Sequence, residues 1–339
     1  MIWVKLGTGH ARGRRMDLQG VVLDLDSLAP GDLDLSALEA SLPRWRMYGA
    51  TARGEVQDRI RGAEVVLSNK VVLDREAMSA APSLRLVIVM ATGTNNVDLD
   101  AARELGIQVC NVRDYATTSV AEHALMMMLA LARGLGAYRA GALDGAWSRS
   151  PFFCLHAAPI VELSGRRVGI VGCGQLGSAV ARRCEALGME VVVAQLPGRT
   201  PQPVAWPRLP LEELLATSAV TSLHCPLTVE TRGLIGRREL ALMPRGSLLV
   251  NTARGGLLDE AALLRALREG HLGGAALDTL ESEPPPEGSA LLDAARTMEN
   301  LLLTPHVAWA GRGARQRLVD QMVEIIAAFR GGEAANRVA

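Results

Sequence analysis

Three polar side chains in the second half of the chain are of the types needed for acid–base chemistry on a small carboxylic acid: Arg254 in NTARGG, Glu283 in DTLESEP and His306 in TPH. An arginine binds a carboxylate through two parallel N–H donors, and a histidine gives or takes a proton near neutral pH. A nearby glutamate can set the protonation of that histidine. These residues predict hydride transfer between a 2-keto acid and a 2-hydroxy acid. Arg254 would bind the substrate carboxylate, and Glu283 and His306 would form the catalytic acid–base pair. Both Arg254 and His306 would contact the substrate. Taken singly, Arg254 could form a structural ion pair and His306 could be a hydrogen-bonded core residue.

A glycine-rich loop lies upstream of these residues, directly after the apolar run 168–171 and directly before an amphipathic segment. Its residues are Gly172, Cys173, Gly174, Gln175, Leu176 and Gly177. In a strand–loop–helix context, the three glycines allow a tight turn, close approach of the backbone to a pyrophosphate, and close packing of the helix on the strand. The helix that begins at Gln175 and Leu176 would present amide donors to phosphate. The loop predicts a nicotinamide dinucleotide site, while a plain connecting turn and a phosphate-only site stay open as alternatives.

The residue that normally selects the dinucleotide is changed. An acidic side chain usually binds the ribose hydroxyls about twenty residues after the glycines, and Gln195 stands there instead. Glutamine does not repel a 2′-phosphate, and Arg199 could pair with one or could be a solvated loop charge. NAD or NADP is therefore expected, and Gln195 with Arg199 is compatible with NADPH.

These residues need two sheets to position them. Short apolar runs alternate with helix-like segments, which is typical of an α/β protein with parallel strands. The candidate strands are 21–25, 65–67, 84–90, 168–171, 191–194, 219–224, 247–251, 274–277 and 301–304. The last helix, about 312–329, could return to the first unit. We expect two Rossmann-like domains: a discontinuous, flavodoxin-like substrate domain at 17–117 and 308–339, and a dinucleotide-binding domain at 118–307. Residues 1–16 are expected to be a disordered extension, with a misassigned start as the alternative for the first fifteen.

One helical segment is almost wholly apolar. It runs from Ala116 to Leu135, and its pattern predicts Thr118 or Ser119 as the N-cap. Such a helix must be buried, either between domains, in a subunit interface or in an ordinary core.

Composition excludes several classes of protein. Lysine plus arginine and aspartate plus glutamate both number 36 among 339 residues, so no net field would attract nucleic acid or an anionic membrane. The five cysteines form no CxxC pair, which argues against a disulfide framework and a zinc site, and no metal is expected. No segment is long and uncharged enough for a membrane span, so a cytoplasmic protein with a small-molecule partner is expected.

The motifs, in this order, resemble the D-isomer-specific 2-hydroxyacid dehydrogenase family from about Val21 almost to the C-terminus. The resemblance implies that Arg254 binds substrate, that Glu283 and His306 form the acid–base pair, and that Asp278 contacts the nicotinamide amide. It also implies a homodimer.

Two further segments look like the parts of the family that touch the cofactor. HCPLT, which contains His224 and Pro226, would lie against the cofactor, and Thr252 and Ala253 would lie at the nicotinamide ring. Oxidation of Cys173 in the glycine loop could block cofactor entry.

The substrate side of the resemblance rests on the first half of the chain. ATGTNNVD looks like the family loop whose backbone amides, here at Thr92, Gly93 and Thr94, would hold the substrate carboxylate beside Arg254. A simple strand-to-helix turn is the alternative. SNK, which contributes Asn69, and the ending HVAWA are most similar to the glycerate dehydrogenase, or hydroxypyruvate reductase, members of the family, and favour hydroxypyruvate or glyoxylate as substrate.

Rival functions differ in what they require of these residues. Glu283, rather than a glutamine, argues against the formate dehydrogenase branch, whereas oxidation of phosphite and reduction of bulkier keto acids stay open. A nicotinamide-sensing corepressor on the same fold would not need a matched arginine, glutamate and histidine.

Overall fold

The computed structural model describes residues 18–198 and 203–339; the predicted disordered extension 1–16 and Arg199 lie outside the described residues. The chain divides into two compact units, unit 1 (Met1–Tyr115 with Arg315–Ala339) and unit 2 (Ala116–Ala314). Each unit is built on a parallel β-sheet, so the predicted α/β class with two parallel sheets is confirmed. Unit 1 is assembled from two separate stretches of sequence.

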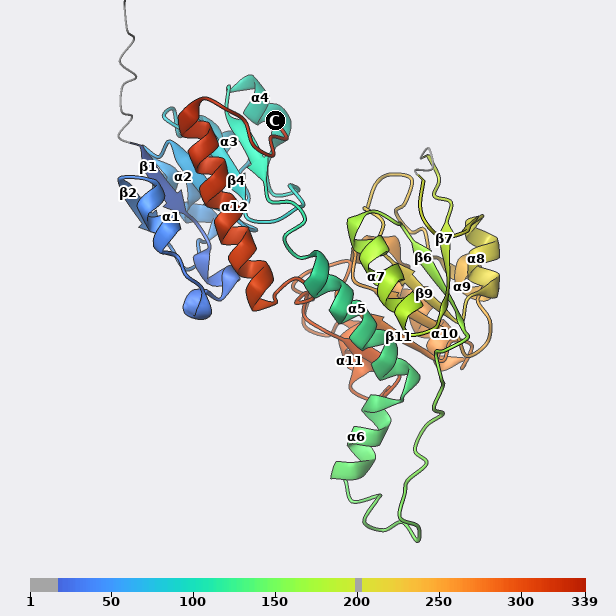
Figure 1. The fold of residues 1–339 in the computed structure, drawn as a ribbon. Helices are drawn as coiled ribbons and strands as arrows, with labels where there is room; N and C mark the ends of the chain where they lie inside the picture. The colour runs from blue at the N-terminus through green and yellow to red at the C-terminus, as the bar shows by residue number, and fades with distance from the viewer. Residues whose placement is uncertain (1–17, 199–202) are drawn as a thin grey trace, which may run out of the picture. The chain divides into compact units, whose positions relative to one another are not determined.

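Unit 1 contains a five-stranded parallel sheet with strand order β2-β1-β3-β4-β5 (Figure 1). The strands are β1 Gln19–Val22, β2 Arg44–Met47, β3 Val65–Ser68, β4 Leu86–Val89 and β5 Gln108–Asn111. This is the flavodoxin-like order. All residues of β3 and β4 are buried, which explains their unbroken apolar sequences, since a central parallel strand is covered on both faces.

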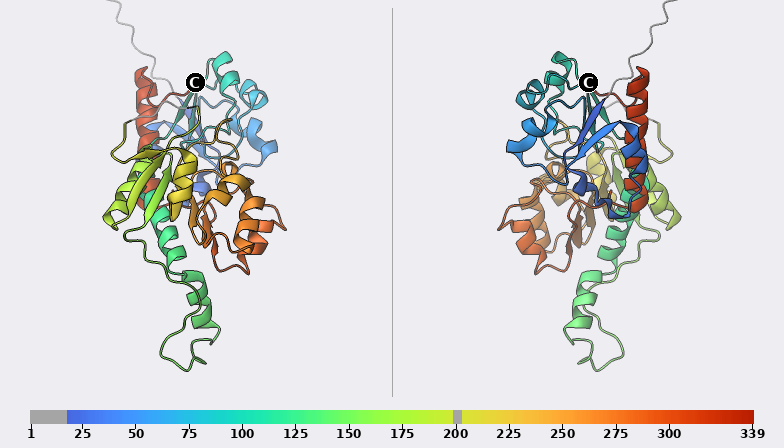
Figure 2. Two further views of the ribbon diagram at one scale, coloured as in Figure 1. Left: turned by 90° about the vertical axis from the view of Figure 1, so that its right-hand side faces the viewer. Right: turned by 90° about the vertical axis from the view of Figure 1, so that its left-hand side faces the viewer.

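Helices cover both faces of this sheet. Helices α2 (Val56–Ile60), α3 (Arg75–Ser79) and α4 (Leu99–Glu104) share one apolar core with the strands. Helices α1 (Ser36–Ser41) and α12 (Arg312–Gly331) lie on the other face (Figure 2). Three short 3-10 turns, η1 (Leu25–Leu28), η2 (Pro30–Asp32) and η3 (Arg53–Glu55), complete the connections of this unit. The guanidinium of Arg315 in α12 binds the Asp32 carboxylate and the Leu28 and Ala29 carbonyls, which fixes the returning helix to the N-terminal stretch.

Unit 2 contains a seven-stranded parallel sheet with strand order β12-β11-β10-β9-β6-β7-β8. The strands are β6 Arg167–Val171, β7 Glu190–Ala194, β8 Arg208–Leu209, β9 Val220–Leu223, β10 Leu248–Asn251, β11 Gly274–Leu277 and β12 Leu301–Leu303. The chain changes direction across the sheet between β6 and β9, and ligands of such sheets bind outside the carboxyl ends of the strands at this point.

The helices of unit 2 also form two layers (Figure 1). Helices α5 (Thr117–Ala132) and α7 (Gln175–Ala186) pack on one face through an Ala-, Val- and Met-rich core. The opposite face is covered by α8 (Leu211–Thr217), α9 (Arg237–Leu242), α10 (Glu260–Arg268) and α11 (Ala290–Ala295), and η4 (Gly255–Leu257) follows β10.

The apolar segment 116–135 forms a helix that ends three residues earlier than expected. Helix α5 ends at Ala132, Gly134 takes a left-handed φ of 59°, and α6 (Leu135–Leu143) leaves at an angle of 63° to α5. The predicted N-cap is wrong: α5 begins at Thr117 with Ala116 as N-cap, and the Ser119 hydroxyl, inside the first turn, donates to the Ala308 carbonyl instead. No single helix in the described part of the chain is long and apolar enough to cross a membrane, and α5 and α6 reach that length and apolarity only as a bent pair.

Candidate active site

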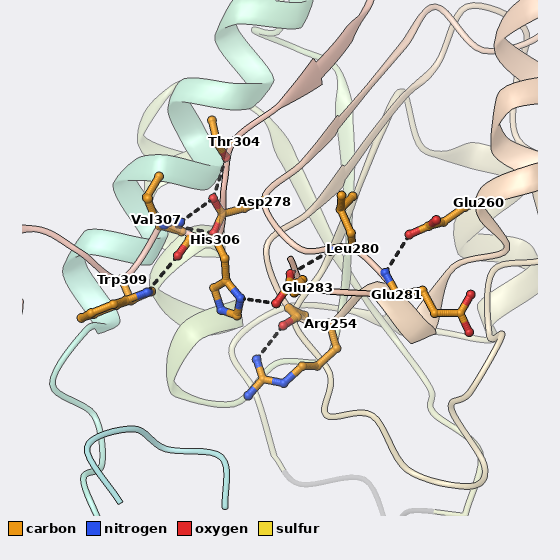
Figure 3. A network of polar contacts seen from close by, with 12 residues as sticks. Arg254, Glu260, Asp278, Leu280, Glu281, Glu283, Thr304, His306, Val307 and Trp309 are labelled. Carbon is orange, nitrogen blue, oxygen red and sulfur yellow. Dashed lines mark hydrogen bonds and ion pairs between the residues drawn. The ribbon is translucent and has the colours of Figure 1, made fainter. Parts of the chain in front are cut away.

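The sheet of unit 2 brings the three predicted catalytic residues to one edge. Arg254, Glu283 and His306 follow β10, β11 and β12, which are neighbours in the sheet. Because parallel strands end at the same edge, side chains that follow them are placed together. Figure 3 shows the imidazole of His306 directed at Glu283, with the Arg254 side chain on the same side of the sheet edge.

Glu283 and His306 form a direct hydrogen bond. The distance from Nδ1 of His306 to Oε2 of Glu283 is 2.6 Å. The other carboxylate oxygen of Glu283 accepts the backbone N–H of Leu280 at 2.8 Å. Glu283 is therefore held from both oxygens, and it fixes the orientation of the imidazole while Nε2 stays available for a proton transfer.

The backbone around His306 is constrained. His306 has a left-handed φ of 53°, which is uncommon for a residue other than glycine. Its N–H donates to the Asp278 carbonyl at 2.9 Å, and its carbonyl accepts the indole N–H of Trp309 at 2.9 Å. The surrounding structure thus maintains an unusual conformation at a proposed catalytic residue.

Asp278, for which the family resemblance implies a nicotinamide contact, has a buried side chain that binds its own protein. Its carboxylate accepts the backbone N–H groups of Val307 and Ala308, both at 2.9 Å. The side chain is 1% exposed. The structure therefore shows Asp278 stabilising the segment that carries His306.

Arg254 lies on a short loop that is closed by Asn251. The Asn251 side chain donates to the Arg254 carbonyl and accepts the Ala253 N–H. The Arg254 guanidinium is exposed and donates to the Ala253 carbonyl at 2.7 Å, so it is accessible to a carboxylate from solvent. Gly255 is required here, because a Cβ atom would lie 1.9 Å from the backbone of Leu280.

The glycine loop has three different local environments. Gly172 has a φ of 97°, and a Cβ atom there would lie 2.5 Å from the backbone nitrogen of Cys225. A Cβ on Gly174 would meet nothing within 4 Å, whereas one on Gly177 would lie 1.9 Å from the Gly172 carbonyl oxygen. The first and third glycines are thus needed by the protein itself, while open space at the second leaves room for a ligand against the backbone. Gln175 and Leu176 form the first turn of α7, whose backbone N–H groups have no partner within the helix and no side-chain cap at Gly174.

The segment after β9 lies beside the glycine loop. The His224 N–H donates to the Val171 carbonyl at 2.7 Å, and the His224 imidazole pairs with the Ser222 hydroxyl at 2.8 Å. Although His224 retains some solvent contact, burial lowers the pKa of its imidazole to about 4, so the ring is neutral at physiological pH. Pro226 is exposed two residues later.

The other predicted cofactor residues lie at neighbouring strand ends. Gln195 directly follows β7 with an exposed side chain, and its N–H donates to Leu209 of β8 at 2.8 Å. Thr252 directly follows β10, and its buried hydroxyl has no hydrogen-bond partner. Ala253 is half-buried. Among the described residues, no group of three or more histidine, cysteine or carboxylate side chains could hold a metal ion.

The predicted substrate residues of unit 1 follow β3 and β4. The Asn69 side chain is 5% exposed and donates to the Ser27 hydroxyl at 3.0 Å, so its amide group is already engaged. Thr92 is exposed, and Gly93 and Thr94 are half-buried in the same loop. The Asn111 side chain fixes this loop by donating to the Thr92 carbonyl at 2.7 Å.

Comparison with known proteins identifies the family. Residues 125–308 match the model of the D-isomer specific 2-hydroxyacid dehydrogenase NAD-binding domain. The chain belongs to the D-isomer specific 2-hydroxyacid dehydrogenase family. This dehydrogenase is therefore an oxidoreductase that uses a nicotinamide cofactor on 2-hydroxy or 2-keto acids.

Individual relatives are similar over almost the whole dehydrogenase. It is 42% identical to a glycerate dehydrogenase of Methylorubrum extorquens, with 94% of this chain and 98% of the relative covered. It is 36% identical to a hydroxypyruvate reductase of Blautia hydrogenotrophica, with the same coverage of 94% and 98%. The crystal structure of TT0316 protein from Thermus thermophilus is 37% identical, with a TM-score of 0.82 over 95% of this chain and all of that one.

One residue that the sequence did not reveal organises the loop after β3. The buried Asp24 carboxylate, after β1, accepts the backbone N–H groups of Asn69 and Lys70 at 2.7 to 3.1 Å. The acidic residues in VVLDLDS were a weak signal, because an aspartate at the end of a buried strand must find donors.

Proposed function

We propose that this dehydrogenase reduces hydroxypyruvate or glyoxylate to the matching 2-hydroxy acid in the cytoplasm, and that the product from hydroxypyruvate is the D isomer. The observation that carries the proposal is the 2.6 Å hydrogen bond between Glu283 and His306 at the strand edge that also bears Arg254. The relatives named glycerate dehydrogenase and hydroxypyruvate reductase support this choice of substrate. Five free cysteines suit a reducing compartment.

In this proposal each residue has one task. Arg254 binds the substrate carboxylate with two N–H donors and so orients the carbonyl. His306 donates a proton from Nε2 to the carbonyl oxygen as the alcohol forms, and takes it back in the reverse direction. Glu283 stabilises the protonated imidazole and fixes its rotation through Nδ1. The nicotinamide cofactor, when bound, supplies or accepts the hydride.

The glycine loop fits such a cofactor. Open space at Gly174 and the first turn of α7 at Gln175 and Leu176 would receive the pyrophosphate. The remainder of the cofactor site is assigned to His224, Pro226, Thr252 and Ala253. Asp278, whose buried carboxylate is engaged by Val307 and Ala308, would border the nicotinamide. Gln195 accommodates either NAD or NADP, because its side chain carries no negative charge to repel a 2′-phosphate.

In unit 1 we assign the backbone amides of Thr92, Gly93 and Thr94, with Asn69, to the substrate. The exposure of Thr92 and the partial exposure of Gly93 and Thr94 support this assignment. Since the Asn69 side-chain amide is engaged by Ser27, its contribution would be to position the loop.

We also propose a homodimer, supported by apolar side chains that unit 2 leaves exposed along α5, α6 and the segment after them. They are Met126, Leu129, Leu135, Leu143, Trp147, Phe152, Phe153 and Ile160. Phe153 is 92% exposed, and a charge there should weaken such an interface. Light scattering should therefore give a dimer mass for the wild type and a lower average mass for Phe153→Asp at micromolar concentration.

A panel of substrates and cofactors tests the function. Nicotinamide oxidation would be followed with hydroxypyruvate, glyoxylate, pyruvate and an aromatic keto acid, each with NADH and NADPH, and with His306→Asn as control. Fast reduction of one of the first two acids, lost by about 10²–10⁴ in the variant, supports the proposal. No turnover on any keto acid, despite tight cofactor binding, would favour phosphite oxidation or a cofactor-sensing protein.

A further inference from the structure

We propose that His123 in α5 is a positioning residue for the acid–base pair, acting through Thr304 and Asp278 on the segment that carries His306. The inference rests on the proposed function for its kinetic consequence, but its structural part can be tested without turnover. All of the residues involved belong to unit 2.

A continuous hydrogen-bonded chain connects α5 to this segment. Nε2 of His123 lies 3.0 Å from the Thr304 hydroxyl, and that hydroxyl lies 2.6 Å from Oδ1 of Asp278. The side chains of His123 and Asp278 are 15% and 1% exposed. Because water has little access, these bonds are not readily replaced by bonds to solvent.

The Asp278 carboxylate determines which atom donates in each of these hydrogen bonds. An ionised Asp278 only accepts hydrogen bonds, so the single hydroxyl proton of Thr304 must point to it. The hydroxyl oxygen then has only lone pairs to offer His123, and Nε2 of His123 must carry a proton. Nε2 also lies 3.6 Å from Oδ1 of Asp278, where its N–H dipole or positive charge is favourable.

At its other end, this series of hydrogen bonds holds the backbone of His306 and of the two residues after it. The Asp278 carboxylate accepts the N–H groups of Val307 and Ala308, and the Asp278 carbonyl accepts the N–H of His306 itself. Figure 3 shows Thr304, His306 and Val307 gathered around Asp278. A carboxylate that loses its contact with Thr304 and His123 would be free to rotate, and its two backbone acceptor positions would be lost together.

Helix α5 contacts the same segment at a second point. Ser119, one helical turn before His123, donates to the Ala308 carbonyl at 2.6 Å and accepts the Gly311 N–H at 3.2 Å. Residues four apart lie on one face of a helix. One face of α5 therefore contacts both ends of the segment 304–311, and His123 is the residue that acts on the carboxylate.

The consequence for catalysis follows from the φ of 53° at His306. A left-handed residue returns to more common backbone angles when its surroundings relax. The imidazole would then move away from Glu283. Because a displacement of about 1 Å costs about 10²-fold in rate where geometry limits the reaction, a smaller displacement costs correspondingly less.

Three variants separate positioning from general packing. His123→Leu removes the donor while keeping an apolar volume, and His123→Gln keeps an N–H donor at a similar reach. Thr304→Val removes the hydroxyl with almost no change in shape, and it serves if His123→Leu does not fold. The matched control is His271→Leu, since His271 is also a half-buried histidine of unit 2. Within the described part of the chain, its ring hydrogen-bonds only to the Leu240 carbonyl.

Hydrogen exchange of the amides at Val307 and Ala308 is the first measurement, and it needs no substrate. We expect at least about tenfold faster exchange in His123→Leu and Thr304→Val, because protection of an amide reports its local opening. Wild-type rates are expected in His123→Gln and His271→Leu. Unchanged exchange in both His123→Leu and Thr304→Val would overturn the proposal.

Kinetics is the second measurement. We expect kcat to fall by about tenfold in His123→Leu, with the KM of the nicotinamide cofactor unchanged, and to recover in His123→Gln. The double variant His123→Leu/Thr304→Val should lose no more than either single variant, because both break one chain. Faster exchange with wild-type kcat would also overturn the positioning role. If the wild type reduced no keto acid, the proposed function would fail, whereas hydrogen exchange would still decide whether His123 holds the segment.

Discussion

Nδ1 of His306 lies 2.6 Å from Oε2 of Glu283, and this contact assigns different tasks to the two ring nitrogens. Replacing Glu283 with Gln keeps a hydrogen-bonding group but removes the charge that stabilises an imidazolium. We expect kcat for keto-acid reduction to fall by about 10–10²-fold with little change in cofactor KM. Glu281→Gln, in the same loop but with no contact to His306 among the recorded bonds, is the control for steady-state kinetics. An equal loss in both variants would show that Glu283 acts only through the loop.

Arg254 should affect substrate binding more than chemistry. Within the described residues, its exposed guanidinium donates only to the Ala253 carbonyl, so it can bind a carboxylate with two donors. Arg254→Ala should raise the KM for the keto acid by about 10²-fold, and Arg254→Lys, which cannot form the paired contact, should recover only part of this loss. Arg245→Ala is the control, since Arg245 contacts the Gly270 carbonyl at the other end of the strands. An unchanged KM in Arg254→Ala would disprove the clamp.

Two glycines of the same loop should respond differently to alanine. Gly172→Ala forces a side chain into a φ of 97° and against the backbone of Cys225, so its melting temperature should fall, with a cost of about 2 kcal/mol or more. Gly174→Ala meets no protein atom within 4 Å and should keep the wild-type melting temperature. It should nevertheless bind NADH at least about tenfold more weakly, because its methyl group would occupy the space left for the pyrophosphate. Fluorescence titration with a melting curve checks both, and tight NADH binding by Gly174→Ala would argue against a pyrophosphate there.

Gln195 gives a direct test of cofactor preference. It stands exposed after β7, where a carboxylate would bind ribose hydroxyls and repel a 2′-phosphate. Gln195→Asp should lower kcat/KM with NADPH by at least about tenfold while that with NADH is kept or improved. Gln195→Asn is the uncharged control. If both variants changed the two cofactors alike, residue 195 would not face the ribose.

His224 predicts a specific acid sensitivity. Burial lowers the pKa of its imidazole from 6.5 to about 4, so between these values the unfolded chain binds a proton that the folded chain does not. The free energy of unfolding is therefore unaffected by His224 above pH 6.5. It decreases as the pH falls from 6.5 toward 4, and it changes no further below 4. Between pH 7 and pH 5 this amounts to about 1–2 kcal/mol, after allowance for partial solvent contact. His224→Gln, compared with wild type by urea unfolding at both pH values, should remove that part of the pH dependence, and identical pH dependence in the two proteins would contradict it.

The sequence was most informative where an element is buried on both faces. The unbroken apolar runs of β3, β4 and β10 predicted strands, because only central parallel strands need such runs. The strands that it did not reveal, β2, β5 and β8, lie at the edges of the two sheets. In β2 the arginines of RWRM alternate with partly buried residues, and β8 has only two residues, so neither carries a strong periodic signal.

The site shows the same division between local and long-range information. Residue types alone suggested an arginine, a glutamate and a histidine with matched chemistry, and the structure places them at neighbouring strand ends. The hydrogen bonds from Val307 and Ala308 to Asp278 could not be predicted, because they depend on the pairing of β11 with β12, two strands that are separated in the sequence. Likewise, the end of α5 at Ala132 depends on the left-handed backbone of Gly134, which the apolar pattern conceals.

The return of α12 to the first sheet has a consequence for the order of folding during synthesis. Val338 and Ala339 bond to Val109 of β5, and Leu318 and Met322 of α12 are fully buried. Unit 2 is one continuous stretch and can become compact while the ribosome is still working. Unit 1 begins first but must wait, with apolar sheet surface uncovered, until residues 315–339 have emerged. A nascent chain stalled before that point would hold a folded second unit behind an incomplete first one, and it would be the form most in need of a chaperone.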